Sequence, residues 1–221
     1  MRLFRSVVIG LAVALIASFV MALGSSAPAS AETGPGITIN NPLAGPKRQF
    51  VILRQINNAI RQAHPGSQIR ISSWNVRSPS AVRALIRAHR RGVSVQVIMA
   101  KENASKRVPN GLFAKLRKGL RQGNQGRVPG THSWVIRCKS SCRGTTGISH
   151  TKYYLFSATG NATNVVMYGS ANLTNLAATN QWNTLRTVLD ERLYTFFANI
   201  FAQQRLDTPL AAPFISAELG G

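Results

Sequence analysis

The chain has 221 residues and a formal net charge of +21 at pH 7, with 27 basic residues against six acidic ones. A charge this one-sided exceeds what solubility alone usually needs and favours polyanionic partners: nucleic acid, anionic lipid head groups or acidic wall polymers. Only one long apolar run occurs, at the N-terminus, so the rest of the chain is expected to be a soluble domain.

Residues 1–31 have the pattern of a secretory signal peptide. A short basic head precedes an apolar run over residues 6–24, and a small-residue tail ends in Ala29-Ser30-Ala31, which matches a signal-peptidase site. We predict cleavage before Glu32 and a secreted mature protein. An uncleaved membrane anchor is the alternative, because the run is nearly long enough to span a bilayer. The remaining part, about 190 residues, suits one domain with its own core.

Residues 32–46 are rich in Gly and Pro and are predicted to be a flexible lead-in to a domain over residues 47–207. Apolar spacing predicts a helix over 47–63, and alternation predicts a strand over 68–74. A second helix over 81–91, with Ser80 as its N-cap and Gly92 as its terminator, precedes a strand over 93–100. This order predicts an α/β fold with a mixed, mostly parallel sheet flanked by helices.

Residues 101–130 form the most basic stretch and contain one short predicted helix. Cys138 and Cys142 follow a predicted strand over 134–137, and in an exported protein they are expected to form a small disulfide. Half of a metal site is the alternative, but four-ligand spacing is absent and we expect no metal. The later predicted elements are strands over 149–157, 164–168 and 184–189, a helix over 191–204, and a loose tail over 208–221.

The strand SHTKYYLFS carries an unusual pair of polar side chains. His150 and Lys152 stand two residues apart, which puts both on one face of a strand, and a lysine on a buried strand needs a reason. An edge strand with outward polar residues is the alternative. Ser170 and Asn172 have the same spacing after the next strand. If the two strands are neighbours, an imidazole nucleophile meets an ammonium, a hydroxyl and an amide, which suits a phosphodiester.

H-x-K followed by G-S-x-N resembles the phospholipase D superfamily, whose pattern is H-x-K-x4-D-x6-G-S-x-N. The resemblance implies that His150 forms a phosphohistidine intermediate, that Lys152 and Asn172 hold the phosphate, and that Ser170 binds phosphate or steadies the histidine. It implies no cofactor. It also implies a phospholipase D-like half-domain, because the family's site combines two such motifs and this chain has one. We therefore expect a homodimer or a missing second half-domain.

The chain departs from the family pattern at two supporting positions. Ser157 stands where the pattern has aspartate. In single-motif nuclease members, a glutamate about thirteen residues after the motif serine supports the histidine, and here that position is Asn183. An asparagine accepts a hydrogen bond but does not stabilise a cationic imidazole as a carboxylate does. A weakened or inactive enzyme is therefore an alternative.

Three functions follow from the sequence. The first is a secreted phosphodiesterase of the phospholipase D type that hydrolyses phospholipid head-group phosphodiesters. The second is a secreted, metal-independent nuclease that uses the same site, which the basic stretch over 101–127 favours because phosphate contacts dominate nucleic-acid affinity. The third is a catalytically decayed protein that binds polyanions or anionic surfaces.

Overall fold

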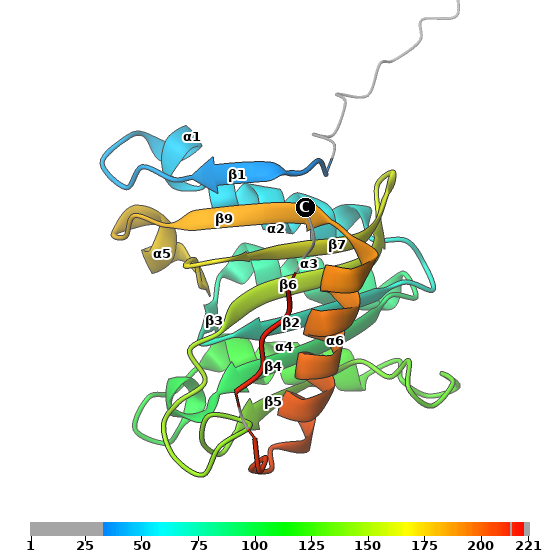
Figure 1. Cartoon of the computed structure of the whole chain (residues 1–221). Helices are drawn as coiled ribbons and strands as arrows, with labels where there is room; N and C mark the ends of the chain where they lie inside the picture. Colours follow the sequence, from blue (N-terminus) through cyan, green and yellow to red (C-terminus); the bar gives the residue numbers. More distant parts are fainter. Residues whose placement is uncertain (1–32, 213, 219–221) are drawn as a thin grey trace, which may run out of the picture.

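The computed structural model describes residues 33–212 and 214–218, and its centre is a seven-stranded sheet in the order β1-β9-β7-β6-β2-β4-β5 (Figure 1). A two-stranded ladder pairs β3 with β8 beside it. The strands are β1 Gly36–Ile39, β2 Gln68–Ser73, β3 Val76–Arg77, β4 Ser94–Ala100, β5 Trp134–Cys138, β6 Lys152–Thr159, β7 Ala162–Gly169, β8 Leu173–Thr174 and β9 Thr184–Leu189. The helices are α1 Pro46–Gln49, α2 Val51–Gln62, α3 Pro79–Arg90, the 3-10 helix Lys101–Ala104, α4 Gly111–Arg121, α5 Asn175–Thr179 and α6 Glu191–Leu206.

The mixed α/β sheet is confirmed, but the expectation that it is mostly parallel is wrong. Within the seven-stranded sheet only the β2–β4 and β4–β5 pairs are parallel, and these are the strands joined by the crossover helices α3 and α4. The pairs β2–β6, β6–β7, β7–β9 and β9–β1 are antiparallel. For β6 and β7 the reason is local: a two-residue turn joins them, and such a turn permits only antiparallel pairing.

The helices cover both faces of the sheet. Helices α2, α3 and α4 lie behind it in Figure 1, while α6 crosses the front. The larger core cluster joins α2, α3 and α4 to the sheet. A second cluster packs α6 residues such as Phe201 against Tyr153 and Leu155 of β6. Phe201 is fully buried, which contributes about 1.5–3 kcal/mol to stability. The disulfide between Cys138 and Cys142 closes a loop directly after β5.

Two local predictions need correction. The lead-in contains β1, which pairs with β9 at the edge of the sheet. Its Ile37-Thr38-Ile39 alternation is short and flanked by Gly and Pro, so the sequence analysis took it as part of the lead-in. The second predicted helix begins earlier than expected, because Ser78 rather than Ser80 is the N-cap and its hydroxyl accepts a hydrogen bond from the backbone N–H of Ala81.

Two further expectations concern the ends of the chain, namely the signal peptide and the loose tail. The predicted signal peptide, residues 1–31, lies outside the described residues. Across the part of the chain that the structure describes, no helix is both long and apolar enough to cross a membrane. The described tail after α6 has no helix or strand and runs back across the same face of the sheet as α6 (Figure 1, red).

Candidate active site

The polar motif residues gather where β2 and β7 end and β6 begins, and this side of the sheet is called the motif edge below. The end of β2 pairs with the start of β6 at Ser73 and Lys152, and the start of β6 pairs with the end of β7 at Tyr153 and Tyr168. The two motif-bearing strands are therefore neighbours, as the sequence analysis required. His150 and Lys152 enter this edge just as β6 begins, and Ser170 and Asn172 leave it just after β7 ends.

His150 precedes β6 and does not lie within it, so the expectation that it shares a strand face with Lys152 is wrong. Its side chain is exposed and meets the ring of Trp74 edge to face, with 5.3 Å between the ring centroids. The indole N–H of Trp74 donates to Glu102 Oε1 at 2.9 Å. The tryptophan thus links the histidine to a carboxylate.

The electrostatic surroundings of His150 favour the neutral imidazole. Partial burial and then the charge of Lys152 lower the pKa of His150 from its ordinary value of 6.5, against the weaker opposing effect of Glu102. A neutral ring has the free lone pair that attack on phosphorus needs. Sequence reasoning missed Glu102, although it is the one acidic residue in the most basic stretch of the chain.

Lys152 is the first residue of β6 and is 8% exposed. Its Nζ donates to the backbone carbonyl of His150 at 2.7 Å, and burial lowers its pKa. This hydrogen bond ties the lysine to the backbone that carries the imidazole. The ammonium therefore stands close to the proposed nucleophile even though the two side chains do not share a strand.

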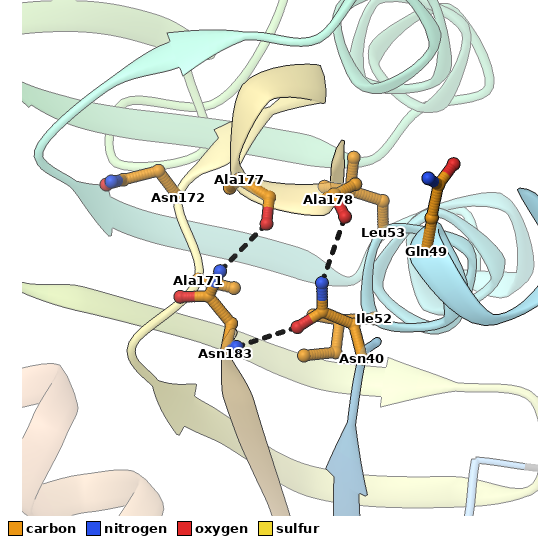
Figure 2. Close-up of a pocket in the computed structure, with 9 residues that line it drawn as sticks. All are labelled: Asn40, Gln49, Ile52, Leu53, Ala171, Asn172, Ala177, Ala178 and Asn183. Atoms are coloured by element: carbon orange, nitrogen blue, oxygen red, sulfur yellow. Dashed lines mark hydrogen bonds between the residues drawn. The ribbon is translucent and has the colours of Figure 1, made fainter. Parts of the chain in front are cut away.

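Ser170 and Asn183 are hydrogen-bonded to each other. The hydroxyl of Ser170 donates to Asn183 Oδ1 at 2.9 Å and accepts from the backbone N–H of Thr184 at 3.0 Å. Asn183 Nδ2 donates to the carbonyl of Ala177 at 2.8 Å, and its backbone N–H donates to Asn40 Oδ1 at 2.7 Å (Figure 2). These bonds fix the amide of Asn183, with its oxygen toward the serine.

Asn40 is the second residue that the sequence analysis missed. It directly follows β1 in the supposed lead-in, is 1% exposed, and donates from Nδ2 to the carbonyls of Ala178 and Gln181. No local pattern signals this role, because its partners lie about 140 residues away in sequence. The cavity that Asn40 and Asn183 help to line is about 10 Å³, which leaves room for at most a water molecule.

Asn172 is 7% exposed, and its Oδ1 has no hydrogen-bond partner among the described residues. Figure 2 shows its side chain directed away from Asn40 and Asn183. Buried polar atoms are nearly always paired, so this amide has hydrogen-bonding capacity left for a ligand.

Ser157 lies apart from these residues. It stands five positions along β6 from Lys152, roughly 16 Å away at the usual rise of a strand. Its hydroxyl accepts a hydrogen bond from the backbone N–H of Gln68 at 2.8 Å, which supports the start of β2. The structure thus gives Ser157 a place in the sheet and does not bring it to the motif. Within residues 33–212 and 214–218, no three His, Cys, Asp or Glu side chains group as metal ligands do.

Comparison with known proteins places this geometry in a family. Residues 56–205 match the model of the family described as "Cardiolipin synthase, PLD-like domain". A phospholipase D family member, Nuc, from Salmonella typhimurium is 17% identical, with 79% of this chain and 96% of that chain covered and a TM-score of 0.56. NucT from Helicobacter pylori is 16% identical, with 80% and 98% covered and a TM-score of 0.56. These likenesses establish the fold. No curated protein matches the chain significantly.

Proposed function

The chain belongs to the PLD-like domain family within the phospholipase D superfamily, and from that premise we propose that it is a phosphodiesterase that works through His150 without a metal ion. One observation carries the proposal. An imidazole held largely neutral stands beside a buried ammonium at the edge where the amide of Asn172 has unused hydrogen-bonding capacity.

The reaction proceeds in two displacements. A ring nitrogen of His150 attacks phosphorus, an N–P bond forms, and the P–O bond to the leaving alcohol breaks while a general acid gives the alkoxide its proton. Water then attacks the phosphohistidine, the same acid, now a base, takes the water's proton, and the N–P bond breaks to release a phosphate monoester. Lys152 and Asn172 stabilise the charge that builds on the non-bridging oxygens.

The general acid comes from a second copy of the chain. Among the described residues, no other histidine lies at this edge: His89 is buried in hydrogen bonds to Ser133 and Gln122, and His132 bonds to the carbonyl of Arg127. A C2 dimer with its axis at the motif edge would place two His150 side chains together.

The preferred substrate is the head-group phosphodiester of a phospholipid. Three large apolar side chains project near the motif residues, two from loops and Leu176 from α5: Leu43 is 86% exposed, Leu176 61% and Trp182 60%. The hydrogen bonds of Asn40 hold the end of β1 to the carbonyls of Ala178 and Gln181 in the segments that carry Leu176 and Trp182. Exposed Leu and Trp enter the interfacial region of a bilayer, and a strongly positive protein is drawn to anionic leaflets. Export of the protein, which would place it at outer surfaces, is part of the same proposal.

A nuclease activity is the second candidate, and a separate observation favours it. The loops that follow β4 and β5 at the motif edge carry the exposed cations Lys101, Lys106, Arg107 and Lys139. Cations beside a phosphodiester site neutralise the phosphates that flank a scissile bond.

Purified protein should be incubated with phospholipid vesicles and, separately, with a labelled oligonucleotide, both with a chelator present. We expect head-group release that His150→Ala abolishes and that His64→Ala, an exposed histidine before β2, leaves intact. Cleavage of the oligonucleotide alone would assign the nuclease function. Binding of both substrates without cleavage would assign a decayed binding protein and refute the catalytic role of His150.

A further inference from the structure

A pocket of about 490 Å³ adjoins His150 on the face of the sheet that α6 covers. It is separate from the small cavity beside Asn183. Its walls are mainly apolar and come from β6, from α6, from the loop after the disulfide and from the C-terminal tail. The apolar and aromatic residues that line it are Ile148, Tyr153, Phe196, Phe197, Ile200 and Ile215.

One guanidinium lines this apolar pocket without a counter-charge. Two nitrogens of Arg143, Nε and Nη2, are shielded from solvent and have no hydrogen-bond partner among the described residues. None of the described residues that line the pocket is acidic. A shielded cation with unpaired donors is costly, and an anion in the pocket would remove that cost.

The C-terminal tail holds Arg143 in place and forms part of the pocket. The backbone N–H of Leu210 donates to the carbonyl of Arg143 at 2.9 Å, and Ile215 lines the pocket beyond it. On the other side, the disulfide ends at Cys142, which immediately precedes Arg143 and has a positive φ of 70°. The backbone that carries the guanidinium is therefore braced on both sides.

We propose that this pocket receives the head group of an anionic phospholipid, with the head group's carboxylate or phosphate paired to Arg143 while the scissile phosphodiester lies at His150. The inference rests on the proposed lipid function and adds the class of head group. A nucleic-acid strand suits the pocket less well, because a strand needs a row of cations along its backbone, whereas this pocket has apolar walls and a single guanidinium.

Competition within one vesicle tests the proposal, since both substrates then share one surface potential. Vesicles containing phosphatidylserine and phosphatidylcholine are hydrolysed, and released serine and choline are measured together. We expect wild type to favour serine release. Arg143→Met should lower the serine-to-choline ratio about ten- to a hundredfold, the range for losing a charge-assisted hydrogen bond. Arg121→Met, which removes an exposed charge from α4, should leave it unchanged. An unchanged ratio in Arg143→Met overturns the proposal.

A binding measurement separates this inference from the proposed function. In His150→Ala protein, the Arg143 Nε–H nuclear magnetic resonance signal, assigned by its loss in Arg143→Lys, should move on addition of glycerophosphoserine and stay in place with glycerophosphocholine. If wild type hydrolyses no lipid and the signal still moves, the proposed function fails and the pocket assignment stands. A signal that is silent to glycerophosphoserine, or that moves only with a trinucleotide, overturns the assignment.

Discussion

Gly169 is the position where one added methyl group should disturb both stability and catalysis. It ends β7 opposite Leu185 of β9, directly before Ser170. A Cβ at this position would overlap the carbonyl oxygen of Thr184. It would lie 2.9 Å from the carbonyl carbon of Thr184 and 3.1 Å from the Cα of Leu185. Carbon atoms pack at roughly 3.5–4.0 Å, so β9 must retreat by about 0.6–1.1 Å. No positive φ is involved, so the requirement for glycine is one of space.

That displacement acts on the motif directly, because Ser170 exchanges hydrogen bonds with Thr184 and bonds to Asn183. Overpacking of this kind costs about 1–3 kcal/mol, and in a chain of this size each kcal/mol lowers Tm by about 2–4 °C. A shift near 1 Å can lower the rate about 100-fold. We therefore expect Gly169→Ala to lower Tm by roughly 2–12 °C and to lose most of its turnover.

Calorimetry and a turnover assay with a chromogenic phosphodiester test this expectation. The matched control is Gly111→Ala at the start of α4, where an added Cβ meets nothing within 4 Å. The control should melt at or slightly above the wild-type temperature, because alanine favours a helix. A Gly169→Ala protein with wild-type Tm and turnover would refute the reasoning.

Replacing Cys138 and Cys142 by serine should cost about 2 kcal/mol, the chain-entropy value for so short a loop, and calorimetry should show Tm lower by roughly 4–8 °C. A nuclear magnetic resonance titration should place the pKa of His150 below 6.5, so the acid limb of the rate profile should also lie below pH 6.5. Lys152→Met should raise the pKa of His150, because it removes a neighbouring positive charge. Burial raises the pKa of Tyr154, so above pH 10 the unfolded state loses a proton that the native state keeps, and stability falls; Tyr154→Phe should flatten that decline in denaturant titrations.

Elements with a strong periodic pattern were predictable from the sequence. The strand over 184–189 was located to the residue, and the strand over 93–100 and the helix over 191–204 to within one or two residues. Alternation of apolar and polar residues marks the two strands, whereas the helix has only weak amphipathic spacing. β1 alternates only over Ile37-Thr38-Ile39, which is too short a stretch to stand out in a Gly- and Pro-rich segment. The predominance of antiparallel pairing was missed because the order of elements does not fix strand direction.

The position of the motif residues at the ends of neighbouring strands was predictable, because short local patterns are informative there. Glu102 and Asn40 were not predictable, because they depend on contacts between distant segments. Glu102 reaches His150 through Trp74, and Asn40 reaches Asn183 across 143 residues. The exact place of His150 was also missed, because nothing in its sequence neighbours shows that the strand starts only at Lys152.

The hydrogen bond between Asn40 and Asn183 also limits the order in which the parts of the domain can fold. It joins Asn40, which follows β1, to Asn183, which precedes β9, the last strand in the described part of the chain. The amide that orients Ser170 therefore cannot be fixed until nearly the whole chain is present and this long loop has closed, which makes such contacts slow to form. A growing chain would carry His150 before the residues that orient Ser170 could join.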